Sequence, residues 1–255
     1  MSTQIDFARL SIEQFAERFR CEMIPLSNTF SYFAVMPLAE EEIKEYLEEP
    51  IAALPPAIPS GLPKVSVILT PYLEKADGKE RANGRMADLV SFEKPPENRQ
   101  SWASEFISPE EAVLVFAIKD QEVADYHYSF YHRIATLTAD RWVEDSQNRF
   151  FSLLREELSG EVHGEVDEQS WHLKQALLRR QTNVRRETKL FRDYARRSFI
   201  DTLTLYLHGI CCDIDVETGP RQLPSRHLRK RLELLHALYP PPEGYAVFPE
   251  DANKS

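Results

Sequence analysis

The stretch from Asp120 to Gly219 contains no proline, and this feature constrains the fold more than any other. Proline breaks helices because it lacks a backbone N–H and clashes with the preceding turn. Long helices are therefore permitted in the second half, whereas the prolines of the first half limit it to short elements. We expect a mixed α/β half over residues 1–119, with a Pro-rich connector at 50–63, and a helical half over 120–255, packed together as one cooperative unit.

Hydrophobic patterns in the first half predict both helices and strands. Ser11 and Gln14 have the spacing of a capping box at the start of a short helix, and the continuously apolar residues 112–118 are typical of a central strand covered on both faces. These patterns predict an α+β protein with a small, mainly antiparallel sheet and N-terminal helices, followed by a C-terminal bundle of long helices. The other predicted elements are a helix at 39–49 that Pro50 ends, an extended connector at 50–63, and strands at 29–35, 64–74 and 85–93.

Apolar residues in the second half recur at helical spacing. Val123, Phe130 and Leu137 share one face of the first predicted helix, and a phase shift at 139–141 predicts a kink. Val143 is expected to be buried by the helix that follows. The second predicted helix ends near residue 158, and a glycine-containing loop follows at 160–167. The third predicted helix spans 168–208 without interruption, and the last spans 226–239.

Several classes of protein are excluded by what the 255 residues lack. No segment approaches the roughly 20 apolar residues that cross a bilayer, and the N-terminus lacks the basic start and apolar core of a signal peptide. Three cysteines, two of them the neighbours Cys211 and Cys212, fit a reducing compartment, so we expect a cytoplasmic protein. The motifs of dinucleotide oxidoreductases, P-loop NTPases, zincins and α/β-hydrolases are absent.

A row of basic residues follows one face of the helix predicted at 168–208. At about 100° per residue, the row falls within an arc of about 140°. It could contact nucleic-acid phosphates, lie on an anionic membrane, or pair with the acidic segment 140–168 of the same chain. The net charge of −10 does not exclude nucleic acid, because a local patch can bind while the remaining surface repels. The row consists of Lys174, Arg179, Arg185, Arg186, Lys189, Arg192, Arg196 and Arg197.

His132 and Asp125 are the best candidates for acid or base catalysis. They share one helical face with Ser129, whereas His127 lies on the apolar stripe. Side chains that lie in parallel on one helix face cannot form the chained contacts of a catalytic triad. A catalytic pocket would therefore need a second helix, and the alternative is aromatic core packing beside a polar surface row.

His208, Cys211 and Cys212 have the helical spacing of metal ligands. No CxxC pair accompanies them, and buried reduced cysteine is common, so packing at a helix end is the alternative interpretation. His163 likewise is either a metal contact or a solvated loop residue. The sequence identifies no cofactor.

Two functions are compatible with these features. The first is a non-catalytic interaction subunit or adaptor of a cytosolic assembly, with a protein partner and with contacts from the basic row to nucleic acid or an acidic partner. The second is an enzyme with an acid/base or metal pocket between sheet and helical bundle. The absence of known catalytic motifs favours the first, and the sequence indicates neither a substrate nor an oligomeric state.

Overall fold

The computed structural model describes residues 10–75, 81–82, 85–86, 88–179, 186–212 and 221–248. The chain divides into two compact units. The first contains Met1–Glu49 and Leu62–Ser129, and the second contains Pro50–Gly61 and Phe130–Ser255. Strands lie in the first and long helices in the second, which confirms the predicted α+β class.

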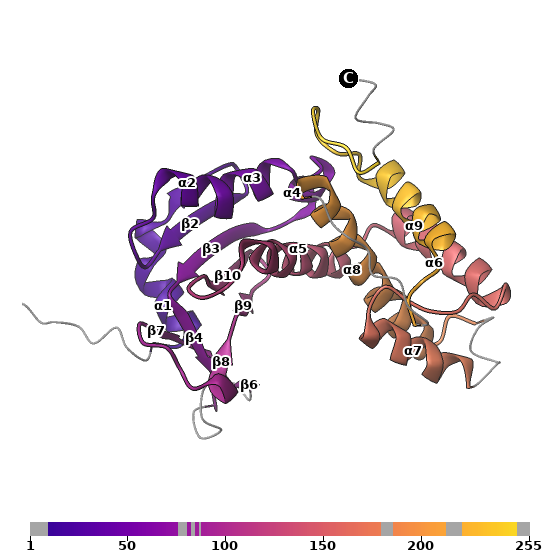
Figure 1. Ribbon diagram of the computed structural model, residues 1–255, viewed down its shortest axis with the longest axis horizontal. Helices are drawn as coiled ribbons and strands as arrows, with labels where there is room; N and C mark the ends of the chain where they lie inside the picture. The colour runs from indigo at the N-terminus through magenta and orange to yellow at the C-terminus, as the bar shows by residue number, and fades with distance from the viewer. Residues whose placement is uncertain are drawn as a thin grey trace, which may run out of the picture. The chain divides into compact units, whose positions relative to one another are not determined.

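The first unit is built on a mixed five-stranded sheet with the order β1-β2-β3-β10-β9 (Figure 1). Strands β2, β3 and β10 are parallel to one another, and the outer strands β1 and β9 are antiparallel to their neighbours. An antiparallel sheet with the order β7-β4-β8 and the β5-β6 pair complete the strands. Their bounds are Ile24–Pro25 (β1), Phe30–Ala34 (β2), Lys64–Thr70 (β3), Tyr72–Lys75 (β4), Arg81–Ala82 (β5), Arg85–Met86 (β6), Asp88–Ser91 (β7), Gln100–Ser101 (β8), Ala103–Ile107 (β9) and Glu111–Ala117 (β10).

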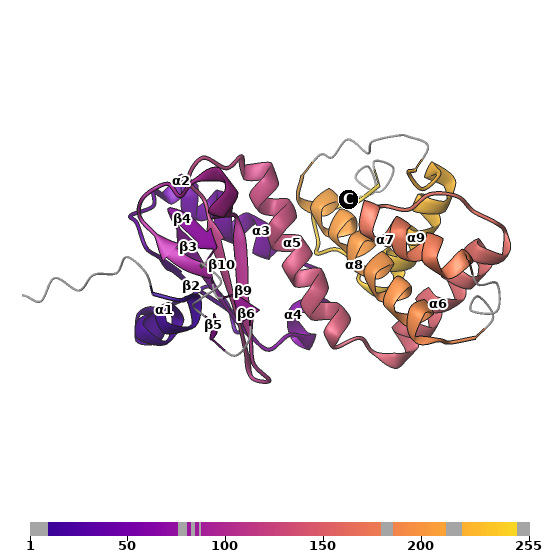
Figure 2. The ribbon, with the colours of Figure 1, turned by 90° about the horizontal axis from the view of Figure 1, so that it is seen from below.

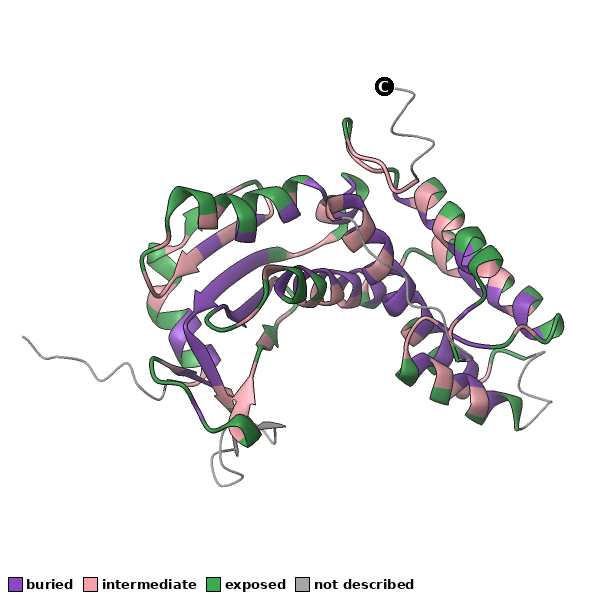
Figure 3. Cartoon of the chain, viewed as in Figure 1, coloured by how far each residue is buried: buried purple, intermediate pink, exposed green. Residues whose placement is uncertain are grey.

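The centre of this sheet is apolar on both faces. Strand β10 lies between β3 and β9, and its residues 112–117 are all buried, as the continuous apolar run predicts. Figure 3 shows β3 buried along most of its length. Helix α1 (Ile12–Phe19) begins with the predicted capping box of Ser11 and Gln14, and its Phe15 packs in the same core cluster as Val113.

The predicted extended connector is wrong, because residues 50–63 contain helical turns. A helical segment runs from α2 (Glu40–Ile43) through a π-helical turn (Lys44–Glu48) into α3 (Glu49–Ala52), beyond Pro50, and α4 spans Ala57–Gly61. Pro50 cannot donate to the carbonyl of Tyr46 four residues earlier. The Tyr126 hydroxyl donates to that carbonyl at 2.7 Å, and His127 Nε2 lies 2.8 Å from the Glu45 carbonyl oxygen. These two side chains therefore satisfy carbonyls of the widened turn, which allows the helix to pass the proline.

The second unit is a bundle in which α8 packs against α6, α7 and α9 (Figure 2). None of the described helices is both long and apolar enough to span a membrane. Val143 is 67% exposed, so its predicted burial is wrong; it precedes the first turn of α6 and lies outside the helical stripe. The long helices of the chain are α5 (Val123–Asp140), α6 (Glu144–Ser159), α7 (Glu168–Leu178), α8 (Lys189–Cys211) and α9 (Ser225–Leu238).

The uninterrupted helix predicted over 168–208 is also wrong. Helix α7 ends at Leu178, and α8 begins at Lys189 after Thr188, whose side chain accepts from the backbone N–H of Phe191. A threonine that caps the next turn starts a new helix. The two helices pack against each other, and the predicted row of basic residues is therefore divided between them.

Candidate functional site

A group of buried charged and polar side chains, the Arg231 cluster, lies inside the second unit. Arg231 on α9 is fully buried. Its Nε donates to both carboxylate oxygens of Glu157 on α6 at 3.1 Å, and its Nη1 donates to Glu165 Oε2 at 2.8 Å. The cluster consists of Glu157, Glu165, Lys174, Tyr194, Ser198 and Arg231.

Glu165, in the loop between α6 and α7, is the centre of this cluster. Tyr194 and Ser198 on α8 donate to it, and Lys174 Nζ on α7 lies 3.2 Å from its Oε1. Burial by itself would raise the pKa of Glu165, but the charges of Arg231 and Lys174 outweigh this effect and lower the pKa to about 2. Glu165 is therefore ionised at neutral pH although it is almost fully buried.

The loop that carries Glu165 is fixed by its backbone as well. Gly164 has a φ of 77°, and a Cβ there would lie 2.1 Å from the Gln222 carbonyl oxygen, so only glycine fits. Lys174 Nζ donates to the Gly164 carbonyl at 2.8 Å. Glu165 and Gln222 form a parallel bridge. Two cations and two carboxylates thus balance inside the bundle and join α6, the loop, α7, α8 and α9.

A second group of charged and polar side chains, the Asp201 cluster, consists of the buried Asp201 and the half-buried Arg197, Asp167 and His132. Arg197 Nε lies 2.9 Å from Asp201 Oδ1, and Arg197 Nη2 lies 3.4 Å from Asp167 Oδ1. Burial raises the pKa of Asp201 to about 7 despite the opposing charge of Arg197. Burial, together with the charges of Arg197 and Arg133, lowers the pKa of His132 to about 4. At neutral pH, His132 is therefore uncharged and Asp201 is only partly ionised.

His132 and Asp125 both lie on α5, and no hydrogen bond or ion pair joins them in the described part of the chain. His132 is half-buried, and the carboxylate whose charge acts on its ring is Asp167 from the N-cap of α7. Asp125, two turns earlier on α5, is exposed. Asp167 and Asp201 were not among the residues that the sequence indicated.

Four members of the predicted basic row pair with carboxylates of the same chain. Lys174 is buried beside Glu165, Arg192 lies 3.7 Å from Glu187, Arg196 contacts Asp140, and Arg197 contacts Asp167. Pairing with the acidic segment 140–168, one of the three interpretations of the row, thus accounts for Lys174, Arg196 and Arg197, whereas Arg192 pairs with Glu187 outside that segment. Of the other members, Arg179, Arg186 and Lys189 are exposed, and Arg185 lies outside the described residues.

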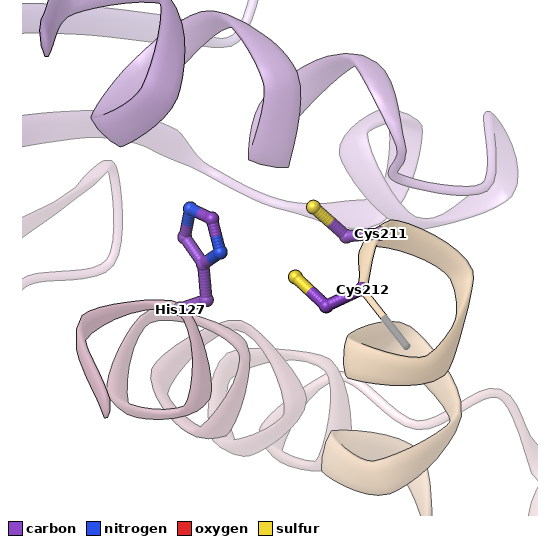
Figure 4. A group of neighbouring side chains, drawn as sticks. All are labelled: His127, Cys211 and Cys212. Carbon is purple, nitrogen blue, oxygen red and sulfur yellow. The ribbon is translucent and has the colours of Figure 1, made fainter. Parts of the chain in front are cut away.

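The predicted metal ligands lie at the C-terminal end of α8. Cys211 is its last residue, Cys212 follows it, and both are half-buried. The His208 ring packs 6.1 Å from the ring of Tyr131, which agrees with a role in packing. Figure 4 draws the two cysteines together with His127 on α5, but His127 belongs to the first unit and the cysteines to the second. The three side chains therefore make up no site within either unit. His163 is exposed in the loop before Gly164.

A groove runs between α6 and α9, and Glu157 of the Arg231 cluster forms part of its lining. It consists of two adjoining cavities of about 580 and 240 Å³. The helices are antiparallel, because the smaller cavity joins the end of α6 to the start of α9. The larger cavity is lined by Asn148, Arg149, Ser152, Leu153, Glu156, Lys230, Glu233 and Leu234, and the smaller by Leu153, Glu156, Glu157, Gly160, Val162, Arg226, His227 and Lys230.

Ion pairs neutralise the carboxylates of this groove. Glu156 lies 3.3 Å from Lys230, Glu233 lies 3.0 Å from Arg229, and Glu157 is held by Arg231. Leu153 and Leu234 are half-buried and form an apolar part of the lining. Sequence reasoning did not find this groove, although both helices carry leucines and charges at helical spacing. Comparison of the chain with protein-family models, curated proteins and solved structures gives no match, so the groove and the two clusters are the basis for assigning a function.

Proposed function

We propose that the chain is a non-catalytic interaction subunit or adaptor whose second unit binds a segment of a partner protein in the α6–α9 groove. The observation that carries this proposal is the groove itself, in which two leucines lie among charged side chains on a pair of antiparallel helices. Amphipathic helices bind such grooves by placing apolar residues on the leucines and polar residues at the rim. The three cysteines, two of them adjacent, agree with a cytosolic assembly.

The groove supports a protein partner better than the basic row supports nucleic acid. Phosphate binding requires cations that are available to replace counterions. Lys174 is 1% exposed, and Arg196 and Arg197 already contact carboxylates, so only part of the row is available for such binding. The two helices that form the groove are in addition held by Arg231, which makes their spacing rigid and lowers the entropy lost on binding.

An enzyme is the second candidate function, and the uncharged state of His132 favours it. A neutral imidazole can accept a proton, and the partly ionised Asp201 can donate one. Arg197 contacts Asp201, and its positive charge also lowers the pKa of His132. However, Asp201 is 1% exposed, which leaves it little contact with a substrate. The interaction function is therefore the better supported of the two.

The groove can be tested with a displayed library of helical peptides that is selected on the full chain. We expect selected peptides to lose about tenfold or more in affinity when Leu153 or Leu234 is replaced by glutamine, because apolar anchors dominate such interfaces. Fluorescence anisotropy of the labelled peptides gives the affinity. The matched control is Leu178→Gln, which changes a partly exposed leucine at the end of α7 outside the groove. If every selected peptide binds all three variants equally, the groove is not the binding site.

A further inference from the structure

We propose that the occupant of the α6–α9 groove is an acidic amphipathic helix of a partner protein, held by Arg149 at one end and Arg226 at the other. This inference rests on the proposed function and adds the chemical class of the partner. It follows from the charges that the groove leaves uncompensated. Among the described residues, no acidic side chain lies within ion-pair distance of Arg149 or Arg226, whereas every carboxylate of the lining has a cationic partner.

The end of the groove at Arg226 presents a positive charge to a carboxylate. Arg226 Nε donates to His227 Nε2 at 3.0 Å, which places the proton of the neutral ring on Nδ1. That Nδ1 is fully buried, so the guanidinium of the exposed Arg226 is the group that can reach a carboxylate in the groove. No side chain caps the start of α9. The positive end of the helix dipole thus adds to the charge of Arg226.

The separation of the two arginines defines the spacing of the partner's carboxylates. Lys230 and Glu156 contact each other and mark the same level of the antiparallel pair. Arg149 lies two turns from this level on α6, and Arg226 lies about one turn from it on α9, in the opposite direction along the groove. At about 1.5 Å per residue, the arginines lie about 16 Å apart along the helix axes. On a helix, this distance corresponds to residues i and i+11, which share one face.

Leu153 and Leu234 lie between the two arginines and fix the position of the apolar residues. With position i opposite Arg149, an occupying helix would place apolar side chains at i+3 and i+4, on the same face as its two carboxylates. A helix with this pattern matches both the charge and the apolar centre of the groove. Nucleic acid would use the arginines but would gain nothing from the leucines.

The test uses the full chain and two synthetic helical peptides. The acidic peptide carries Glu at i and i+11 and Leu at i+3 and i+4, and its twin carries Gln in place of Glu. We expect the acidic peptide to bind the parent chain about tenfold more tightly than its twin, as measured by fluorescence anisotropy at low ionic strength. Arg149→Gln and Arg226→Gln should each remove about threefold of that preference. Arg179→Gln, which changes an exposed arginine at the end of α7 outside the groove, is the matched control and should retain it.

The outcomes separate this inference from the proposed function. If both peptides bind equally and Leu153→Gln weakens both, the groove binds helices but the acidic class is wrong. If neither peptide binds, both this inference and the proposed occupation of the groove by a helix fail. If a DNA duplex binds the parent chain, loses affinity in the Arg149 and Arg226 variants and is unaffected by Leu153→Gln, the groove is a phosphate site and the inference is overturned.

Discussion

The Arg231→Met variant is expected to lose about 3–5 kcal/mol of the free energy of unfolding of the second unit. Methionine fills a similar volume but leaves the buried Glu157 without a hydrogen-bond donor, because Arg231 donates all the bonds that Glu157 accepts from the described side chains. Glu165 retains Lys174 and Tyr194. The loss therefore comes mainly from one uncompensated carboxylate. Urea unfolding at neutral pH, followed by circular dichroism, measures it.

Two further variants identify the cause of this loss. Arg229→Met changes an exposed arginine of the same helix, and we expect a loss of less than about 1 kcal/mol. Arg231→Met combined with Glu157→Leu removes the uncompensated charge and leaves Lys174 paired with Glu165, so it should recover most of the stability. If Arg231→Met is as stable as Arg229→Met, the cluster does not hold the bundle together.

Elements with purely local signals could be predicted from the sequence. The capping box of Ser11 and Gln14 is formed by residues three apart, and both of its hydrogen bonds are present. The apolar run at 112–118 coincides with the buried strand β10, because a strand that is covered on both faces needs apolar side chains on both of them. In these places the hydrogen bonds or the burial of a few neighbouring residues determine the structure.

Errors arose where distant residues determine the structure. Pro50 predicts a helix end, but Tyr126, far away in the sequence, satisfies the carbonyl that the proline leaves without a donor. The absence of proline over 168–208 permits one helix without requiring it. Lys174 and Arg197 lie on different helices, and both reach carboxylates near the start of α7.

The Arg231 cluster has a signal in the sequence. Arg231 lies three residues after Leu228 and four before Leu235, on the apolar stripe of α9, and both leucines are buried. A charge on an apolar stripe predicts a buried ion pair. Its partners could not be predicted, because Glu157 and Glu165 are 74 and 66 residues away in the sequence. Asp201, among the apolar residues of α8, carries the same signal.

Replacing Asp201 by asparagine is expected to make the chain progressively more stable than the parent as the pH rises from about 4 to 7. Burial raises the pKa of Asp201 from 3.8 to about 7, so the unfolded chain releases this proton at lower pH than the folded chain. The folded parent binds more protons between these values, and its stability falls as the pH rises through them. Asparagine removes this dependence, and the relative gain should reach roughly 2–4 kcal/mol above pH 7. Urea unfolding at a series of pH values measures the difference.

His132 has the opposite effect in the same pH range, which allows the two groups to be distinguished. Burial, followed by the charge of Arg197, lowers the pKa of His132 from 6.5 to about 4, so the unfolded chain binds more protons and stability rises with pH. The parent curve is therefore expected to be shallow between pH 4 and 7, because the two slopes oppose each other. His132→Gln should give a falling curve and Asp201→Asn a rising one, whereas Asp193→Asn, at an exposed position of α8, should leave the parent curve unchanged. Parallel curves for the parent and Asp201→Asn would show that Asp201 ionises alike in the folded and unfolded chains.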